Sequence, residues 1–468
     1  MFDPDAYTIA TAIVFPRLLG VIYFFAFGAF LFQIRGLIGE NGILPVKTFL
    51  VWVKRAYPKN YFSVIPSVFW LNHSNAALLG VVATGTALSV LLMAGVYPPL
   101  ILFFLYILYL SIVSAGQEFL GFGWEGFLLE ITFNAFFLTL TTPSNLFIWI
   151  SINLVLFRFH FQGAAVKLQS RDPNWRNLTA VAFHYQSQPI PNTQAWYAHK
   201  LPMWFQKFST LLMFFLELVV PFALFGTDLM RFLAFFCLIS LQFFIWFTGN
   251  FSFLNHLTVV LCTILISNAY FGSYIDAPST TSYPFLDVLC TSVGLFLVAL
   301  QLGFLWNHFY PNNLLNKVSS LFSSFYIANR YGIFAIMTTT RIEIVFEGSD
   351  DGIEWKEYLF YHKPSEVTRR PRRISPYQPR IDWQAWFLPF GYSRHESWFN
   401  NFIYHLLKGT PEVMALLREN PFKDKPPKFV RTLSYDYTFS SVEEKKATGR
   451  WWNRRYVGVF SYPMTLNL

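Results

Sequence analysis

The sequence predicts an α-helical polytopic membrane bundle followed by a mixed α/β, β-sandwich-like soluble domain. The composition is 54% hydrophobic and only 13% charged, whereas about a quarter of the residues in soluble domains are charged. Residues 1–310 hold only 13 Lys and Arg and 11 Asp and Glu, out of 35 and 26 in the whole chain. Residues 1–310 are therefore expected to form the bundle, and residues 311–468 the soluble domain.

Long uncharged stretches locate the membrane spans. A helix needs about 20 apolar residues to cross the hydrocarbon core, and no charged residue occurs between Lys59 and Glu118, which leaves room for two spans and a turn. Three further gaps of this kind separate Glu130 from Arg158, Arg231 from Asp276 and Asp287 from Lys317. About nine transmembrane helices are predicted, near residues 12–34, 75–95, 98–115, 126–141, 144–160, 209–226, 229–248, 252–272 and 286–306.

An odd number of spans places the polar loops 35–74 and 161–208 and the C-terminal domain on one side of the membrane. All three are basic, and the positive-inside rule assigns that side to the cytoplasm. Three N-glycosylation tripeptides begin at Asn72, Asn177 and Asn250 on the same side, and they favour a lumenal assignment instead. Asn72 and Asn177 are the possible glycosylation sites.

The C-terminal domain begins with the pattern of a β-hairpin. Ile342, Ile344 and Phe346 alternate with polar residues, which is the period of a half-buried strand. Residues 348–352, GSDDG, supply turn residues, and a second strand is expected over 355–361.

The remainder of the domain is expected to combine loops and helices. The prolines within 363–380 exclude a helix there, and a helix is expected at 398–407. Another helix begins after Thr410 as its N-cap, with Pro411 in its first turn, and ends before Pro421. A sheet with helical insertions follows from this order.

Ionisable residues within or beside the apolar segments form a candidate intramembrane or interfacial polar site. Its members are Glu125, Glu130, Arg158, Lys167 and His184. Ionisable groups at membrane depth are costly and often functional, which favours a site for a proton or a polar substrate between helices. The alternative is structural: an ion pair, for example between Glu217 and Arg158, that fixes the packing of two helices.

Two clusters of basic residues have the composition of anion-binding sites. Arg158, His160, Lys167 and Arg171 follow the fifth predicted span, where basic side chains either attract lipid phosphates or serve as ordinary interfacial anchors. Arg369, Arg370, Arg372 and Arg373 surround a proline. This second cluster either binds an acidic partner or anionic lipid, or forms a solvated loop.

No motif indicates catalysis. The sequence contains no phosphate-binding glycine loop, nucleophile elbow or HExxH motif. Cys237, Cys262 and Cys290 all lie in apolar segments, which is typical of buried packing residues. His184 and His199 are 15 positions apart with no carboxylate at metal-ligand spacing. We therefore expect no catalytic residue, no cofactor, no metal and no nucleic-acid partner.

Several long motifs, in order, make the chain similar to the lipase maturation factor family. In the first part they are GFGWEGFLLE (121–130), RFHFQGAAVKLQSRDPNWRNLTAVAFHYQSQPIPN (158–192), WFQKFSTLLMFFLELVVPF (204–222) and GNFSFLNHLTV (249–259). In the second part they are RIEIVFEGSDDGIEWKEY (341–358), PYQPRIDWQAWF (376–387), ENPF (419–422) and WWNRRY (451–456). The resemblance runs from about residue 120 to the end of the chain.

The resemblance implies a multi-pass protein of the endoplasmic reticulum membrane, or of the inner membrane in a bacterial source. Members of this family are not enzymes, and they help secreted lipases of the lipoprotein lipase type to fold and assemble into dimers, in the manner of a chaperone. The C-terminal region would then face the lumen and contact the client. The candidate client-binding residues are Trp355, Arg380, Asp382, Trp383, Trp386, Trp451 and Trp452.

An alternative function remains open: an integral membrane enzyme that acts on a lipid or a membrane-adjacent substrate, loosely similar to the vitamin K-dependent carboxylase type. The glutamates at membrane depth beside basic and aromatic residues favour it. A channel or transporter is less favoured, because no inverted repeat or pair of broken helices is evident.

Overall fold

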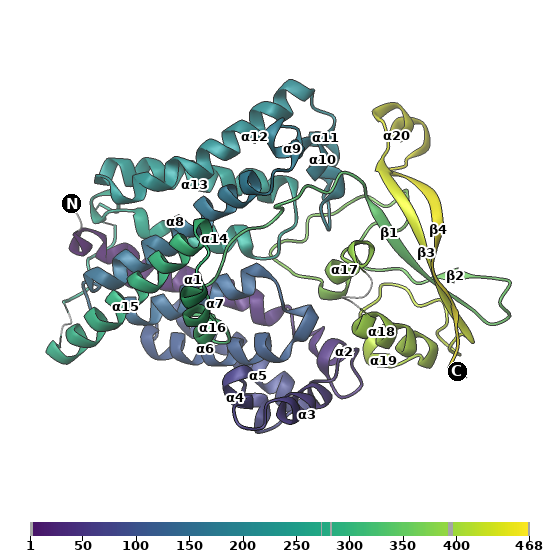
Figure 1. Cartoon of the computed structure of the whole chain (residues 1–468), viewed down its shortest axis with the longest axis horizontal. Helices are drawn as coiled ribbons and strands as arrows, with labels where there is room; N and C mark the ends of the chain where they lie inside the picture. Colours follow the sequence, from purple (N-terminus) through teal and green to yellow (C-terminus); the bar gives the residue numbers. More distant parts are fainter. Residues whose placement is uncertain (1–2, 273, 281–282, 392–395, 467–468) are drawn as a thin grey trace.

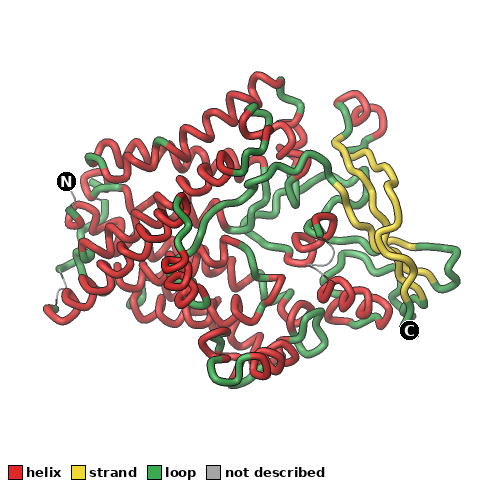
Figure 2. The backbone as a smooth tube through the Cα atoms, in the orientation of Figure 1, coloured by secondary structure: helices red, strands yellow, loops and turns green. Residues whose placement is uncertain are grey.

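A helical bundle and a small β-sheet lie at opposite ends of the molecule. The computed structural model describes residues 3–272, 274–280, 283–391 and 396–466. In Figure 1 most of the helices fill the left and centre, and the strands lie toward the right, with the N-terminus at the far end of the bundle and the C-terminus beside the sheet. Figure 2 shows that strands are confined to that one end.

Seven helices in the described part of the chain are long and apolar enough to cross a membrane. Helix α1 (Phe15–Gly28) continues a π-helical turn, so its span is Ala10–Gly28; α12 (Met203–Leu218) continues into a 3₁₀ segment, so its span is Met203–Phe225. The other five are α5 (Asn75–Ala94), α6 (Pro98–Ala115), α8 (Leu146–Gln169), α13 (Asp228–Thr248) and α15 (Pro284–Phe309). Helix α1 packs against α5, and α8 against α15.

The expected count of nine full-length spans is not reached. The segments predicted at 126–141 and 252–272 correspond to α7 (Gly123–Leu138), which has 16 residues, and to α14 (Leu254–Cys262) with its 3₁₀ extension to Leu265. Sixteen residues rise only about 24 Å, less than the hydrocarbon thickness of about 30 Å. Most side chains of α7 and α14 are buried against neighbouring helices, so neither has to match the bilayer thickness.

Both short helices nevertheless run between the two ends of the bundle. At the N-terminal end, Ser144 after α7 donates a hydrogen bond to Thr11 at 3.2 Å, and Asn268 after α14 accepts one from the Ile9 amide at 2.9 Å. At the opposite end, which we call the domain end, Asn250 before α14 donates to the carbonyl of Ile190 at 3.1 Å. Both polar loops and the C-terminal domain therefore meet at the domain end.

Short helices cover the domain end. The first loop contains α2 (Ile34–Ile38), α3 (Val46–Ala56), α4 (Tyr61–Val64) and the 3₁₀ turn η3 (Val68–Trp70). The second contains α9 (Pro173–Arg176), α10 (Ala180–Ser187) and α11 (Thr193–His199). The 3₁₀ turn η4 (Gln117–Phe119) precedes α7, and α16 (Asn313–Ser323) follows the last span.

The described residues of the C-terminal domain form one four-stranded antiparallel sheet. Its strands are β1 (Ile342–Ser349), β2 (Lys356–Glu357), β3 (Phe429–Phe439) and β4 (Trp452–Met464), in the order β2-β1-β3-β4. Helices α17 (Arg380–Ala385), α18 (Glu396–Lys408) and α19 (Pro411–Met414) belong to this domain, and α20 (Val442–Thr448) joins β3 to β4. The sandwich-like expectation is wrong, because α18 lies where a second sheet would pack: Phe346 of β1 meets Phe402 of α18 at 5.1 Å.

Most of the local predictions within this domain are confirmed. The hairpin turn is present, with Gly352 in the left-handed region at φ +78° and the Asp351 carboxylate accepting the amides of Ile353 and Glu354. The second strand is shorter than expected, since only Lys356 and Glu357 pair with β1. No helix forms in the proline-rich segment until α17 begins at Arg380.

Candidate functional site

The junction between the bundle and the C-terminal domain is built around a buried ion pair. Arg380, at the start of α17, pairs with Glu125 in the first turn of α7, and both side chains are fully buried. The same guanidinium donates to the carbonyl of Phe119 at 3.2 Å, and the hydroxyl of Tyr109 donates to Glu125. Gln33 accepts the Arg380 amide at 2.8 Å. Arg380 and Glu125 thus join three distant parts of the sequence: residue 33, residues 109–125 and residue 380.

A second buried pair lies deeper in the bundle. Arg158 of α8 donates to Glu130 of α7 at 2.9 Å, and both side chains are fully buried. The other carboxylate oxygen of Glu130 accepts from the Tyr331 hydroxyl at 2.6 Å and from the amide and side chain of Asn329 at 2.7 and 2.9 Å. Three hydrogen bonds and the guanidinium of Arg158 compensate for the cost of burying the carboxylate.

The third pair corrects a sequence-based expectation. Glu217 pairs with Lys167 at 2.6 Å, not with Arg158, and both side chains are almost completely buried. The ammonium also lies 5.4 Å from the Trp175 ring. Lys167 is in the last turn of α8, and Arg158 lies more than two turns before it. The sequence shows three glutamates and two basic residues, but the helix packing decides which of them meet.

His184 and His160, from the predicted polar site and anion cluster, are not members of these ion pairs. His184 on α10 packs between the rings of Phe251 and Phe334, at 5.9 and 5.0 Å. His160 is buried, and its ring lies 3.3 Å from the side-chain amide of Gln242. With Arg158 and Lys167 already paired to carboxylates, the basic residues after the fifth predicted span do not form one anion site.

Segment 186–189 of the second loop is held by a buried triad of the domain. Arg341 donates to the carbonyls of Gln186, Gln188 and Pro189 and pairs with Glu343 at 2.6 Å. The same glutamate pairs with Lys363 at 2.9 Å. Because an arginine presents a fork of five donors, one side chain satisfies three carbonyls in a turn that has no regular partner.

Asn250 is a further clamp at the domain end. Its side chain donates to the carbonyls of Ile190 and Arg372 and accepts from the amides of Ile374 and Ser375 at 2.9 and 3.2 Å. The residue is only 2% exposed, so this sequon is closed to modification in the folded protein. Asn72 and Asn177, in contrast, are exposed.

The predicted client-binding surface is mostly buried, and in this respect the prediction is wrong. Of its seven residues, five are buried: Arg380, Asp382, Trp383, Trp386 and Trp452. Asp382 accepts the amides of His362 and Lys363 at 2.5 and 2.9 Å, and burial raises the pKa of its carboxyl. Trp386 donates to the carbonyl of Ser187 at 2.9 Å. Trp386 thus connects the domain to the second loop, and Arg380 connects it to α7.

The two remaining tryptophans are partly exposed and lie against basic side chains. Trp355 stacks with Arg431 at 4.0 Å, and Trp451 with Lys445 at 4.1 Å. Both rings therefore have one face occupied, and neither belongs to a continuous apolar surface with the other.

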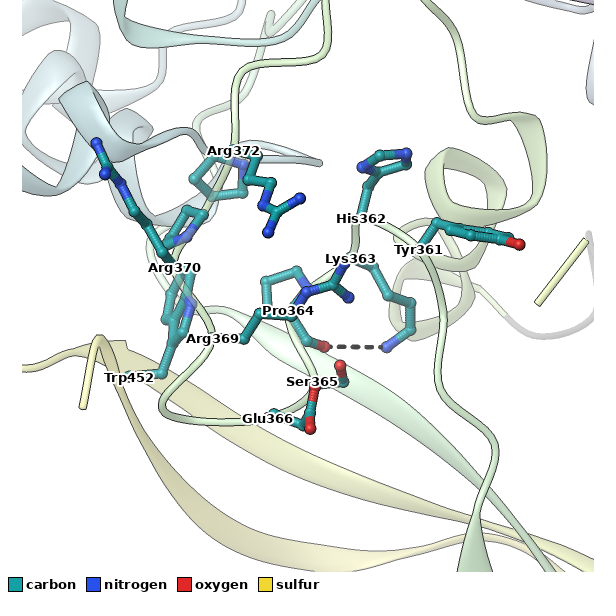
Figure 3. Close-up of a pocket in the computed structure, with 12 residues that line it drawn as sticks. Tyr361, His362, Lys363, Pro364, Ser365, Glu366, Arg369, Arg370, Arg372 and Trp452 are labelled. Atoms are coloured by element: carbon teal, nitrogen blue, oxygen red, sulfur yellow. Dashed lines mark hydrogen bonds between the residues drawn. The ribbon is translucent and has the colours of Figure 1, made fainter. Parts of the chain in front are cut away.

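The basic run around Pro371 forms one wall of a small cavity (Figure 3). Three of its arginines donate to the protein: Arg369 to the Phe360 carbonyl at 3.0 Å, Arg370 to the Thr193 hydroxyl at 3.0 Å, and Arg373 to the Phe247 carbonyl at 3.2 Å. In Figure 3 the guanidinium of Arg372 points into the space between the segment 361–366 and Arg370. The cavity is only about 20 Å³, enough for about one water molecule, so the run mainly attaches the domain to the bundle.

The outer strand of the sheet carries exposed apolar side chains. Tyr456, Val457, Val459 and Tyr462 on β4 are between 45 and 79% exposed. Strand β4 is at the edge of the sheet, since it pairs only with β3, and exposed edge strands are sites where another chain can add a strand. Nothing in the sequence pattern distinguished this strand from a buried one, and the sequence analysis missed it.

No cluster of His, Cys, Asp or Glu suited to a metal occurs among the described residues. Glu125, Glu130 and Glu217 each form an ion pair with a basic side chain, so their role in the structure is to hold elements together. The sequence did not indicate Arg341 and Asn250 as junction residues, because most of their partners are backbone carbonyls and amides of distant segments.

Taken together, the fold and the junction define a polytopic membrane protein whose extramembrane domain is fixed rigidly to its helical bundle. The family model described as the lipase maturation factor transmembrane domain matches residues 10–273, and the model of the lipase maturation factor C-terminal domain matches residues 327–463. The chain belongs to the lipase maturation factor family.

Relatives match almost the whole chain. Lipase maturation factor 1 of Bos taurus is 32% identical over an alignment of 502 residues. The alignment covers 97% of this chain and 89% of that protein. Lipase maturation factor 1 of Homo sapiens is 32% identical, with 97% and 88% covered. Lipase maturation factor 2 of Xenopus laevis is 29% identical, with 94% and 80% covered. No solved structure matches the chain.

Proposed function

We propose that this protein is a membrane-anchored maturation factor that assists the folding and dimer assembly of secreted lipases in the endoplasmic reticulum membrane. The observation that carries the proposal is that the family match extends over both the bundle and the C-terminal domain. The relatives are named maturation factors and not enzymes, which is consistent with a chaperone-like role. In a bacterial source the equivalent location is the inner membrane.

We further propose that the domain end faces the lumen, where secreted clients fold. Two exposed sequons, at Asn72 and Asn177, support this orientation, since both loops meet at the domain end. The basic charge of the loops favours the cytoplasm, but long domains translocate largely regardless of charge. A lumenal domain end gives a secreted lipase direct access to the sheet.

The exposed edge strand β4 is our candidate for the client-binding surface. It combines an unpaired strand edge with the apolar side chains of Tyr456, Val457, Val459 and Tyr462. A folding lipase exposes strands and apolar surface before it assembles, and strand addition gives affinity through main-chain hydrogen bonds. The proposal replaces the buried tryptophans as the contact surface.

Cells that lack the protein test the maturation role. We expect a lipase of the lipoprotein lipase type to be synthesised at normal levels in such cells but to be secreted mostly as inactive, non-dimeric chains. Re-expression of the protein should restore the active dimer, measured by lipase activity per mass and by sedimentation. Equal specific activity with and without the protein would reject the proposed function.

A pair of matched variants tests the client surface. Val457→Lys places a charge on β4, and Ile353→Lys places one on the hairpin turn at the other side of the sheet, where Ile353 is 82% exposed. We expect Val457→Lys to reduce the yield of active lipase at least fivefold and Ile353→Lys to leave it within twofold. Equal yields at equal abundance of the two variants would exclude β4.

A further inference from the structure

A large cleft opens where two spans leave the membrane at the domain end. It has a volume of about 680 Å³ and lies between the end of α6, the segment after α4, the turn η4 and helix α16. Phe304, about five residues before the end of α15, lies on its wall. This volume is within the range of small-molecule sites, about 300–1,000 Å³.

The lining of the cleft is amphiphilic. Val113, Leu120 and Phe304 provide an apolar wall, while Ser320, Ser323 and Asn316 of α16 provide hydroxyl and amide groups. Among the described side chains that line the cleft, one is charged, that of Arg330, and none is a carboxylate. An apolar wall with one cation at the rim is complementary to an amphiphile with an anionic head.

Arg330 is held at the rim of the cleft by neighbouring residues. Its guanidinium donates to the side-chain oxygen of Asn316, and the same oxygen accepts from Asn307 at 2.8 Å. Asn307 in turn accepts the amide of Asn312, the N-cap of α16, at 2.7 Å. Since these contacts order the arginine before any ligand binds, less entropy is lost when it binds an anion.

Helix α16 has the character of an interfacial helix. It follows the last span directly, and its Leu314 and Leu321 are 69 and 70% exposed. Helices with apolar residues on one side and polar residues on the other lie at the boundary between headgroups and acyl chains. The polar side of α16 faces the cleft through Asn316, Ser320 and Ser323. The cleft is therefore at the depth of lipid headgroups.

We propose that this cleft binds one anionic glycerophospholipid from the leaflet at the domain end. Its phosphate group would lie against Arg330 and the polar side chains of α16, and an acyl chain would lie along Val113 and Phe304. The binding site is distinct from the proposed client surface on β4 and does not depend on the identity of the client.

The chain offers variants that separate the charge of the site from its volume. Arg330→Gln removes the cation of the cleft. Lys317→Gln is the matched control: it removes a cation from the same region, but Lys317 is an exposed residue of α16 that does not line the cleft. Gly121→Phe fills the cleft from the opposite wall. A Cβ at Gly121 would meet only the Gln117 carbonyl oxygen, at 3.9 Å, so the backbone at this position accommodates a side chain.

The experiment is native mass spectrometry of the full-length protein in detergent, titrated with dioleoyl phosphatidylglycerol or dioleoyl phosphatidylcholine. We expect the wild type and Lys317→Gln to retain one phosphatidylglycerol with at least a fivefold preference over phosphatidylcholine. Arg330→Gln should reduce that preference below twofold, and Gly121→Phe should reduce retention of both lipids at least fivefold. Size-exclusion chromatography verifies that each variant is folded.

Two results would overturn the proposal. One is a folded Arg330→Gln protein that keeps the preference of the wild type. The other is Gly121→Phe with the lipid retention of the wild type, which overturns the proposal whether or not the arginine variant folds. Neither measurement involves a lipase, so failure of the lipid site is distinguishable from failure of the proposed function.

Discussion

Arg380 and Glu125 are 255 positions apart in the sequence, yet they form an ion pair in which neither side chain is accessible to solvent. The arginine belongs to the C-terminal domain and the glutamate to the first turn of α7. A buried pair adds little net stability over an apolar pair, but removal of one partner leaves an uncompensated charge in the interior. The junction therefore depends on the presence of both residues.

Glu125→Gln tests this dependence. We expect the variant to lower the free energy of unfolding by about 3–5 kcal/mol, because Arg380 then remains buried without a carboxylate. The measurement is thermal unfolding of the purified protein in detergent. Asp436→Asn is the matched control: its partner Arg455 has a side chain that is 81% exposed, and an exposed pair contributes about 0–1 kcal/mol. Similar losses in the two variants would contradict a special role for the buried pair.

Lys167→Ala separates a structural role from a catalytic one. Removal of the ammonium leaves Glu217 buried and unpaired, so we expect the abundance of the variant to fall while the maturation of lipase per molecule of protein stays within twofold of the wild type. The double variant Lys167→Met with Glu217→Gln should recover abundance, since no charge is then buried. Normal abundance with lost activity would instead support an intramembrane enzyme.

The three sequons should behave differently if the domain end is lumenal. Asn72→Gln and Asn177→Gln are each expected to remove one glycan, seen as a shift after endoglycosidase treatment, because both residues are exposed. Asn250→Gln should leave the glycan number unchanged but lower the abundance of the protein, since its side chain joins residues 190, 372, 374 and 375. A protein without any glycan in its native endoplasmic reticulum would contradict the lumenal orientation.

His184 should make the protein sensitive to acid. Burial lowers the pKa of His184 to about 4, and Lys167 contributes in the same direction. An unfolded histidine titrates near pH 6.5, so between pH 6.5 and 4 the unfolded state binds a proton that the folded state excludes. The free energy of unfolding therefore falls as the pH drops through this window, and the effect is absent above it.

His184→Phe provides the measurement. A phenylalanine ring fits the contacts of His184 with Phe251 and Phe334 and has no proton to bind. We expect the Tm of the variant to decrease less than that of the wild type between pH 7.5 and 5. Burial also lowers the pKa of His199 and His362, so some pH dependence should remain. An identical decrease in both proteins would refute the assignment.

The parts of the structure that the sequence predicted are those that depend on local residues. Seven of the nine predicted spans correspond to helices long enough to cross a membrane, and the turn residues at 348–352 identified the hairpin. Both predictions succeed because hydrophobicity and left-handed backbone are properties of neighbouring residues. The sequence did not predict that Glu217 pairs with Lys167 and not with Arg158. That choice depends on the rotation of α8 against α12, to which many distant contacts contribute.

The tryptophans illustrate a second limit of the sequence. An aromatic residue in a polar domain is equally compatible with a binding surface and with a small core. Trp383 and Trp386 are buried because α17 is enclosed between the sheet and the second loop, whereas Tyr456 and Tyr462 are exposed because β4 lies at an edge. Burial of this kind follows from the order of strands, which the sequence pattern alone did not determine.

The many attachments of the C-terminal domain also restrict how another protein can approach it. Arg380, Arg341 and Asn250 join it to α7, to the second loop and to the segment before α14. Three separate anchors restrain the sheet against the bundle, which limits how far β4 can move relative to the bilayer. A partner that is itself bound to the membrane would reach that strand from one direction only, because the bilayer would keep both proteins at the same surface.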